Sequence, residues 1–269
     1  MTLPIDIIVP VYRGLAQTRR CLESVLADSG AAARELIAID DASPETGMRA
    51  WLAELARAGR ITLRTHDDNR GFVRTANEGM ALHPDRDVVL LNSDTEVADG
   101  WLDRLAACAR REPRAGTVTP FSNNATICSY PRFCERNSLP EGLSTAELDR
   151  RFARANAGRA LEIPTAVGFC MYIRRDCLDE VGCFDEAAFG RGYGEEVDFC
   201  MRAARRGFRH LLCADTFVYH EGEVSFGDGS GTRESAQRVI DERYPEFPRQ
   251  VRDFVQRDPP RPLREAVSA

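Results

Sequence analysis

The sequence lacks any long hydrophobic run, which excludes a membrane-spanning helix. Such a helix needs about 20 consecutive apolar residues, and no stretch of this chain approaches that length. The first residues also lead straight into a strand-like segment, without the basic region and hydrophobic segment of a signal peptide. We therefore expect a cytoplasmic protein.

Paired cysteines and an excess of positive charge are missing as well. The nine cysteines are scattered without a CxxC pair, and only four histidines are present, so the spacing does not fit a structural zinc site. We interpret the cysteines as reduced, mostly buried thiols. The formal net charge of −6 gives no indication of a nucleic-acid partner.

Strand-like and helix-like segments alternate over the first ninety or so residues, and a hydrophobic content of 43% is enough for a globular core. The expected strands span residues 5–9, 36–39, 61–64 and 88–91, and the helices between them span residues 15–26, 44–58 and 72–82. This alternation predicts the α/β class, with a doubly wound, mostly parallel, Rossmann-like sheet flanked by helices. The four apolar residues Val88–Leu91 predict a strand buried on both faces.

Polar residues follow three of these strands. They are Tyr12, then Asp40 and Asp41, then Asn92, Ser93 and Asp94. In open α/β sheets ligands bind outside the carboxyl ends of the strands, so these residues predict one ligand crevice. Each group alone is also typical of turns and helix caps. Asp94 is a candidate ligand for a divalent cation that would hold a phosphate-bearing substrate.

Glycine-rich phosphate loops are absent from the predicted sheet. Neither GxGxxG nor GxxxxGK[ST] occurs, which excludes the usual dinucleotide fold and the P-loop. We therefore expect a metal, rather than backbone amides, to neutralise any bound phosphates.

The second half of the chain is less regular. We expect helices at 101–110, 144–157, 174–181 and 232–243, a short helix after Pro248, and strands at 116–119, 166–173, 208–213 and 217–219. Residues 120–140 form a long irregular excursion, which is either functional or a solvated surface loop. The glycine- and serine-rich residues 227–231 are predicted to be flexible and to order over a bound substrate. Residues 259–262 look like an exposed tail.

Three acids, Glu195, Glu196 and Asp198, follow a glycine-rich lead-in at residues 190–194. Acids at a helix amino terminus are favoured by the macrodipole, so capping is one explanation. Three acids within four residues exceed what capping needs, which favours a site approached by a mobile loop. We expect Asp198 to support the helix or the loop.

Taken in order, the motifs resemble glycosyltransferase family 2, which has the GT-A fold. The resemblance covers roughly residues 5 to 225 and lies in IIVPVY, IDDAS, NRGF with Asn77, LLNSDT, GWL and SNNAT. It implies transfer of a hexosyl or deoxyhexosyl group from a nucleotide diphosphate donor to a hydroxyl, with inversion at the anomeric carbon. It usually implies a divalent metal, Mn²⁺ or Mg²⁺.

The resemblance also implies roles for single residues on the donor side. Pro10 and Tyr12 would line the nucleoside pocket, and Asp41 would accept a hydrogen bond from a pyrimidine imide. Asn69 and Arg70 would lie near the base or the diphosphate. Asp94 would bind the metal together with His220, which follows a strand at the place where family members have a metal-ligating histidine. Asn92 replaces the first acid of the family's Asp-x-Asp motif, and Ser93 lies between them.

On the acceptor side the resemblance makes Glu196 the general base, with Glu in place of the family's usual Asp. Glu195 would orient the acceptor. We expect Trp101, Gly168 and Tyr193 to contact the acceptor. Gly168 lies within a predicted strand, where glycine marks a bulge or a close backbone approach.

These residues divide the chain into a GT-A domain, residues 1–226, and a helical extension with tail, residues 227–269. Within the domain we expect a nucleotide-binding half, 1–119, and an acceptor-side half, 120–226. UDP- and dTDP-sugars both fit as donors, because both bases carry the imide. The acceptor is a glycan, a lipid-linked glycan or a protein, in glycan or polysaccharide synthesis. Arginines of the tail either contact an anionic membrane or are solvated.

Two other functions stay open. A non-catalytic sugar-nucleotide-binding domain of a larger synthesis complex would explain the missing first acid and the Glu-for-Asp change. A nucleotidyltransferase would share the architecture and the metal, but it needs a glycine-rich, basic signature after the first strand, which residues 10–14 supply poorly.

Overall fold

The computed structural model describes residues 3–222 and 230–268. The predicted flexible segment 227–231 therefore lies largely outside the described residues. The strands are β1 (Ile5–Val11), β2 (Arg34–Asp40), β3 (Thr62–Thr65), β4 (Val88–Leu91), β5 (Thr95–Glu96), β6 (Ala115–Phe121), β7 (Ala160–Ile163), β8 (Cys170–Ile173), β9 (Arg209–Phe217) and β10 (Tyr219–His220). The helices are α1 (Leu15–Ala27), α2 (Met48–Arg57), α3 (Phe72–Met80), α4 (Trp101–Arg111), α5 (Thr145–Ala155), α6 (Arg175–Val181), α7 (Glu186–Phe189), α8 (Glu195–Ala204), α9 (Ser230–Arg243), α10 (Phe247–Arg257) and α11 (Arg261–Ser268), with a 3₁₀ turn at Thr126–Cys128.

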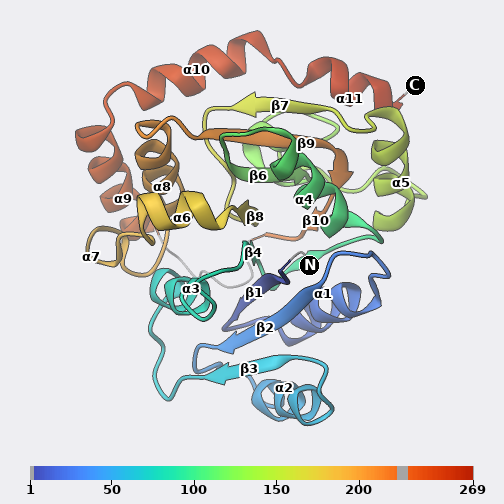
Figure 1. Ribbon diagram of the computed structural model, residues 1–269, viewed down its shortest axis with the longest axis vertical. Helices are drawn as coiled ribbons and strands as arrows, with labels where there is room; N and C mark the ends of the chain where they lie inside the picture. The colour runs from blue at the N-terminus through green and yellow to red at the C-terminus, as the bar shows by residue number, and fades with distance from the viewer. Residues whose placement is uncertain (1–2, 223–229, 269) are drawn as a thin grey trace.

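One eight-stranded sheet, in the order β3-β2-β1-β4-β8-β6-β9-β7, runs through the molecule (Figure 1). Strand β8 is antiparallel to both neighbours, β4 and β6, and β7 is antiparallel to β9. The remaining strands run in one direction, because β1 pairs in parallel with β2 and β4, and β6 with β9. The predicted α/β class with a mostly parallel sheet is confirmed.

Helices cover both faces of the sheet because its strands are apolar on both sides. In β4, Val89 and Leu91 pack into one apolar cluster with residues of α1, α4 and α5. Val88 and Leu90 pack into the other cluster, with residues of α3, α6 and α8. The predicted burial of this strand on both faces is therefore confirmed, and its carboxyl end delivers residues 92–94 to the sheet edge.

Two predicted segments differ from the structure near the carboxyl ends of the strands. Residues 208–219 form the single long strand β9 and the short β10, because the β6–β9 register shifts between Pro120 and Phe121 and brings Phe121 opposite Phe217. Strand β8 begins only at Cys170. Gly168 thus lies in the turn before this strand. The next residue, Phe169, accepts the backbone N–H of Asn92 through its carbonyl.

The start of α2 also differs from the prediction. The sequence places Glu45 in the first turn of that helix, but α2 begins at Met48. The Glu45 carboxylate instead accepts the backbone N–H groups of Gly14 (2.6 Å) and Leu15 (2.8 Å). The carboxylate therefore accepts hydrogen bonds from amide groups at the beginning of α1, which lack partners within the helix. A negative charge is stabilising at a helix amino terminus.

The carboxyl-terminal residues are not an exposed tail, which corrects the sequence prediction. Residues 261–268 form α11, which buries Leu263 and Val267 against the core that includes Phe254 of α10. The Arg264 guanidinium donates to both carboxylate oxygens of Asp258 (2.9 and 2.6 Å). Apolar burial and a forked ion pair therefore hold the end of the chain against the domain.

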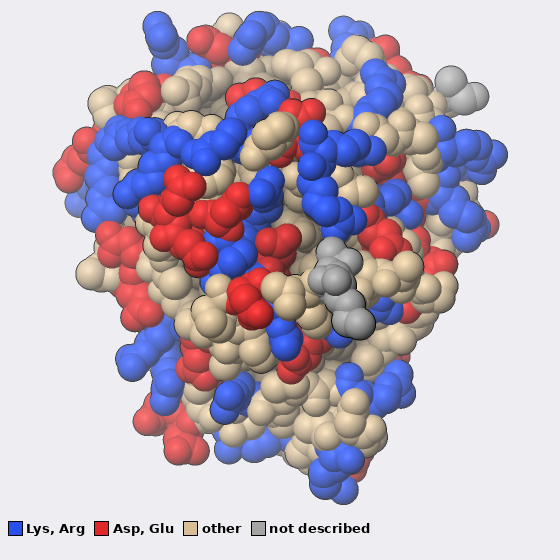
Figure 2. All heavy atoms as spheres, in the orientation of Figure 1, with Lys and Arg blue, Asp and Glu red and all other residues tan. Residues whose placement is uncertain are grey.

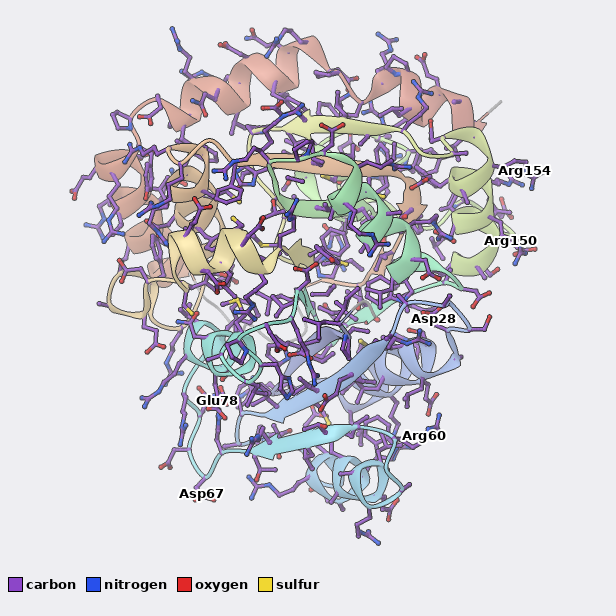
Figure 3. The ribbon with its side chains drawn as sticks, in the orientation of Figure 1. Asp28, Arg60, Asp67, Glu78, Arg150 and Arg154 are labelled. Carbon is purple, nitrogen blue, oxygen red and sulfur yellow. The ribbon has the colours of Figure 1, made fainter. Side chains whose placement is uncertain are left out.

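The surface is rich in charge of both signs. The sequence contains no lysine, so all 36 basic side chains are arginines, and every blue side chain in Figure 2 is an arginine. Arginines form a band over the upper part of this face, with acidic side chains beside them (Figure 2). On α5, Arg150 and Arg154 project outward from the fold (Figure 3).

Candidate active site

A cavity of about 830 Å³ opens at the carboxyl ends of β1, β2 and β4. It brings together most of the residues predicted from the sequence. They are Pro10, Tyr12, Asp41, Asn69, Asn92, Ser93, Asp94, Gly168, Tyr193, Glu195, Glu196 and His220. The 120–140 excursion contributes Asn124, Ala125, Thr126 and Arg136, so this part of it forms one wall of the cavity.

Two predicted site residues lie elsewhere. Trp101 is fully buried in the core on the inner face of α4, so it cannot contact an acceptor. Arg70 does not line the cavity, because its guanidinium turns toward Glu78 of α3, 3.3 Å from the carboxylate. For Arg70 the neighbouring residues Asn69 and Gly71 do line the cavity, while its own side chain packs the other way.

Asp41 is nearly fully buried at the nucleotide side of the cavity. Its Oδ1 accepts the backbone N–H of Arg70 (2.8 Å), and its Oδ2 accepts that of Gly71 (2.9 Å). Asp41 therefore fixes the turn that carries Asn69 into the cavity. At Gly71 the φ angle is +85°, and an added Cβ would lie 3.1 Å from the Arg191 Cα, so this position requires glycine.

His66 stands behind Asp41 and was given no role by the sequence. Its Nδ1 lies 2.8 Å from Asp41 Oδ1, and its Nε2 lies 2.9 Å from Glu78 Oε2. A ring placed between two carboxylates donates from both nitrogens when it is protonated. No sequence motif marks this residue; only its place in the loop after β3, beside the end of β2, brings it to Asp41.

The candidate metal ligands come together through the two-stranded sheet of β5 and β10. Its pairing of His220 with Thr95 brings His220 beside Asp94, with His220 Nε2 3.5 Å from Asp94 Oδ1. The second carboxylate oxygen, Oδ2, accepts the backbone N–H of Gly222 at 2.8 Å. Asn92 Nδ2 lies 3.5 Å from the same His220 nitrogen.

The His220 ring is held in one orientation. Its Nδ1 lies 2.7 Å from the backbone carbonyl of Asn124, a geometry in which Nδ1–H donates and Nε2 keeps its lone pair. The ring also stacks on Phe169, with centroids 5.2 Å apart. An imidazole oriented by a backbone carbonyl on one nitrogen and open on the other is the usual form of a metal ligand.

The two candidate catalytic acids open α8. Gly190, Gly192, Tyr193 and Gly194 all have positive φ angles, so the chain turns sharply into the helix. The Oε2 atoms of Glu195 and Glu196 are both buried, and neither has a hydrogen-bond partner among the described residues. A buried carboxylate oxygen without a partner is costly, and here both carboxylates line the cavity.

Burial sets the protonation of this pair. It raises the pKa of Glu195 well above its ordinary value, and the charge of the neighbouring Glu196 raises it further. Burial also raises the pKa of Glu196, while backbone amides at the start of the helix oppose the shift. The upward pKa shift is thus more pronounced for Glu195, while backbone amides favour the ionised form of Glu196.

Asp198 supports the helix, as predicted. It is fully buried and accepts hydrogen bonds from Arg202 (2.8 Å), Arg243 (2.9 Å) and the Tyr244 hydroxyl (2.7 Å). Two of these partners belong to α9 and the residue after it, so the carboxyl-terminal region anchors the helix that carries Glu195 and Glu196.

A second group of possible metal ligands, Asp6, Glu35 and His83, lies at the opposite edge of the sheet. Asp6 and Glu35 are at the amino-terminal ends of β1 and β2, away from the crevice. Arg86 donates to both carboxylates, at 2.9 and 2.6 Å. The guanidinium thus already supplies the positive charge that this cluster needs.

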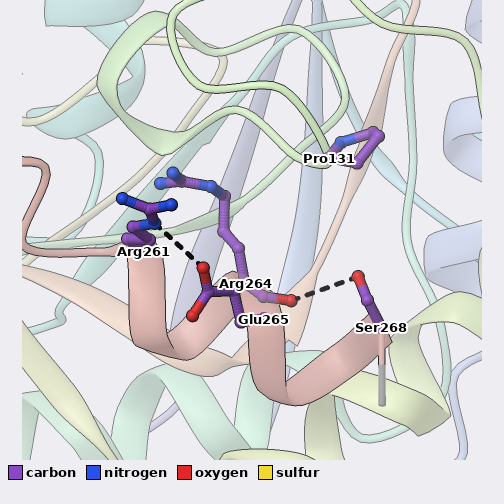
Figure 4. Close-up of a pocket in the computed structure, with 5 residues that line it drawn as sticks. All are labelled: Pro131, Arg261, Arg264, Glu265 and Ser268. Atoms are coloured by element: carbon purple, nitrogen blue, oxygen red, sulfur yellow. Dashed lines mark hydrogen bonds and ion pairs between the residues drawn. The ribbon is translucent and has the colours of Figure 1, made fainter.

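A smaller cavity of about 450 Å³ lies between α11 and the loop at Pro131 (Figure 4). Its charged side chains are engaged with one another: Arg261 donates to Glu265 at 2.9 Å, and Arg264 pairs with Asp258. Among the described residues, no helix is both long and apolar enough to cross a membrane.

Comparison with known proteins places this geometry in a class. Among solved structures, the chain is similar to GalNAc-T7 crystallised with UDP, GalNAc and Mn²⁺ (TM-score 0.66, 17% identity, 89% of this chain and 48% of that one). It is also similar to residues 1–349 of S. aureus TarS (TM-score 0.60, 15% identity, 89% and 65% covered). These likenesses show that the fold is of the GT-A type.

Residues 6–182 match the family described as Glycosyl transferase family 2, and the chain belongs to that family. One relative is the N-acetylglucosaminyl-diphospho-decaprenol L-rhamnosyltransferase of Mycobacterium tuberculosis, 29% identical over 150 residues (52% of this chain, 48% of the relative). Another is an uncharacterised protein of Mycobacterium bovis, 26% identical over 170 residues (62% and 59%). The chain thus spans about half the length of the relatives that it matches.

Proposed function

We propose that the protein transfers a sugar from a UDP- or dTDP-sugar to an acceptor hydroxyl with inversion, in glycan or polysaccharide synthesis. One observation carries this proposal: a single cavity is lined both by Asp94 and His220 and by Glu195 and Glu196, each of which has a buried Oε2 atom without a hydrogen-bond partner among the described residues. Donor-binding and proton-accepting groups thus face the same space, which a transfer reaction between two bound substrates requires.

The donor occupies the side of the cavity built from residues 1–119. Tyr12 offers its ring to the base, beside Pro10. Asp41, whose carboxylate is fixed by the backbone of residues 70 and 71, accepts the imide N–H that uracil and thymine share. Residues 120–222 supply the acceptor side, where Gly168 and Tyr193 contact the acceptor.

The candidate metal ligands fit a divalent cation, Mn²⁺ or Mg²⁺. Asp94 Oδ1 and the Nε2 lone pair of His220 point at one another across 3.5 Å, and both atom types suit these ions. Asn92 adds a neutral contact in place of an acid. When bound, the cation offsets the charge of the donor diphosphate and of the leaving nucleoside diphosphate.

Glu196 acts as the general base. Its carboxylate accepts the proton of the acceptor hydroxyl while the hydroxyl oxygen attacks the anomeric carbon. The bond from that carbon to the diphosphate breaks on the opposite face, so the configuration inverts and the nucleoside diphosphate leaves with the electron pair. Glu195 orients the acceptor through a hydrogen bond.

The acceptor is a glycan, a lipid-linked glycan or a protein. The name of the mycobacterial rhamnosyltransferase describes a diphospho-decaprenol acceptor and a deoxyhexose donor, which supports testing a lipid-linked acceptor and dTDP-deoxyhexoses first. The packed α11 leaves no free tail among residues 261–268, so we propose no membrane contact through it.

A panel of sugar nucleotides tests the proposal. Purified protein is incubated with each donor, Mn²⁺ and candidate acceptors, and release of free nucleoside diphosphate is measured. We expect release from at least one UDP- or dTDP-sugar that depends on the acceptor. Binding of a sugar nucleotide without any release would instead favour a non-catalytic binding domain, and release of pyrophosphate from a nucleoside triphosphate and sugar phosphate would favour a nucleotidyltransferase.

A further inference from the structure

A divalent cation at the candidate metal site would supply only part of the positive charge that the donor phosphates need. Asp94 is the one carboxylate of this site, since Asn92 is neutral and His220 donates through Nδ1 to a carbonyl. A single cation on these ligands does not balance two phosphate groups and the further charge that develops as the diphosphate leaves. Another cation at the same end of the cavity would complete the balance.

Arg136 lies at that end. Arg136 lines the cavity with Asn124 and Gly222, and its Nη2 donates to the backbone carbonyl of Glu221 at 3.0 Å. Glu221 stands between His220 and Gly222, which are the ligand and the residue that anchors Asp94 Oδ2. The guanidinium is therefore hydrogen-bonded to the residue that lies between the candidate metal ligand His220 and Gly222.

The backbone that carries Arg136 is tied to His220 by two buried amide side chains. Asn137 donates through Nδ2 to the carbonyls of Asn123 (3.2 Å), Arg132 (2.9 Å) and Glu135 (2.9 Å). Asn123 in turn donates through Nδ2 to the carbonyls of Asn137 (3.1 Å) and His220 (2.9 Å). Its Oδ1 accepts the His220 backbone N–H at 2.8 Å. The loop and the metal ligand thus form one rigid unit.

The other arginines of the cavity are held elsewhere. Arg13 lies over the Tyr12 ring at 5.2 Å, and Arg233 donates to the Tyr193 hydroxyl at 3.0 Å. The backbone of Arg191 packs against Gly71 on the nucleotide side. Among the described residues, none of these three is hydrogen-bonded to the segment 220–222, which sets Arg136 apart.

We propose that Arg136 binds the donor diphosphate beside Asp94 and His220 and stabilises the leaving nucleoside diphosphate. This inference rests on the proposed function. A guanidinium offers a planar fork of N–H donors that matches two phosphate oxygens. Because its charge is permanent, it holds part of the diphosphate affinity without any divalent ion.

Calorimetric titration tests this assignment. UDP, dTDP and uridine are titrated into the wild type, Arg136→Gln, Arg136→Lys and Arg132→Gln, each with Mn²⁺ and with EDTA. Arg132 is the matched control, because it belongs to the same loop and its side chain pairs with Glu135. In EDTA we expect R136Q to lose about 10- to 100-fold in UDP affinity, the range for a hydrogen bond to a charged group, while uridine affinity stays unchanged.

R136K should bind UDP between R136Q and the wild type, because it restores the charge without the fork. R132Q should bind like the wild type. Equal UDP affinity of R136Q and wild type, an equal loss for UDP and uridine, or R136K binding no better than R136Q would each overturn the assignment. If the wild type binds UDP but no variant differs, the inference alone fails. If the wild type binds neither UDP nor dTDP in either condition, the proposed function fails with it.

Discussion

Asp41 and His66 form a buried pair behind the nucleotide side of the cavity, with His66 Nδ1 2.8 Å from Asp41 Oδ1. Because His66 also reaches Glu78, the pair is one end of a chain of three side chains that joins the cavity wall to α3. The carboxylate that is proposed to read the base is therefore oriented from behind by a residue that never touches the donor.

Replacing His66 should weaken nucleoside recognition. His66→Ala removes one donor to Asp41 Oδ1 and leaves the carboxylate held by the two backbone N–H groups alone, so we expect roughly 10-fold weaker binding of both uridine and UDP, the scale of one hydrogen bond to a charged group. Calorimetry measures this. His83→Ala is the control, since His83 pairs with Asp6 at the other edge of the sheet. Unchanged uridine affinity in H66A would contradict the role of this pair.

Removing the base should stop transfer and spare donor binding. Glu196→Gln keeps the size of the side chain but cannot accept the acceptor proton, so turnover should fall about 10²- to 10⁴-fold. UDP affinity should stay near that of the wild type. Turnover is read as release of nucleoside diphosphate and affinity by calorimetry. Near wild-type turnover in E196Q would mean that another group is the base.

Glu195 should make stability depend on pH in a defined direction. Its folded-state pKa lies above the ordinary value of 4.5, so the folded protein holds this proton more tightly than the unfolded chain. The stability it contributes is full below pH 4.5 and is lost as pH rises toward the folded pKa. Glu195→Gln, which stays neutral, should therefore gain stability over the wild type as pH rises from 5 to 8.

Urea unfolding at several pH values measures that gain. Its slope should approach about 1.4 kcal/mol per pH unit below the folded pKa. Glu54→Gln, on the exposed side of α2, is the control and should show no such trend. A constant difference between E195Q and the wild type across the pH range would show that Glu195 is not protonated in the folded protein.

His210 should make stability depend on pH in the direction opposite to Glu195, so that stability is lost as the pH falls. It is buried between the Thr117 hydroxyl (2.8 Å) and the Cys200 carbonyl (2.9 Å), and burial lowers its pKa from 6.5 to about 4. The stability that it contributes is present above pH 6.5 and is lost as pH falls toward 4. A shift of this size corresponds to about 3 kcal/mol.

The difference in unfolding free energy between the wild type and His210→Gln isolates this effect from that of Glu195. It should be largest at pH 7 and shrink steadily toward pH 4.5. If instead the wild type and H210Q lose stability in parallel on acidification, the imidazole is not the group that charges.

Gly222 should be required for metal-dependent donor binding. Its φ is +79°, and a Cβ there would lie 2.2 Å from Asn124 Nδ2, so Gly222→Ala must shift either the Asn124 side chain or the backbone N–H that holds Asp94 Oδ2. We expect the increase in UDP affinity on adding Mn²⁺ to be lost. Gly182→Ala is the matched control, because its φ is +83° but nothing lies within 4 Å of the added Cβ. The same Mn²⁺ effect in G222A as in G182A would contradict this account.

The sequence predicted the parts of the site that follow long, regular strands. Residues 88–91 are apolar on both faces, so the edge at which Asp94 lies could be placed from the pattern alone. The triplet 92–94 is also a turn, since Thr95 donates to the Asn92 carbonyl. The two interpretations of this triplet are therefore compatible, because the turn is what directs Asp94 into the cavity.

The rest depended on contacts that leave no local pattern. Strands β5 and β10 have two residues each, too few for any periodicity. Trp101 begins an amphipathic helix, but the face that it buries is set by packing on β6 and β9 rather than by its motif. Glu45 accepts backbone N–H groups at the start of a helix about thirty residues earlier in the chain. Arg136 reaches the site through a loop whose course is fixed by Asn123 and Asn137.

The pairing of β5 with β10 determines when the two sides of the site can form during synthesis. The nucleoside side needs only Tyr12, Asp41, His66 and the turn at residues 69–71, all within the first quarter or so of the chain. The candidate metal side joins Thr95 to His220, two residues that are far apart in the sequence, and closing such a long loop is slow. A nascent chain of 200 residues therefore contains every group that is proposed to read the base and none of the segment that anchors Asp94.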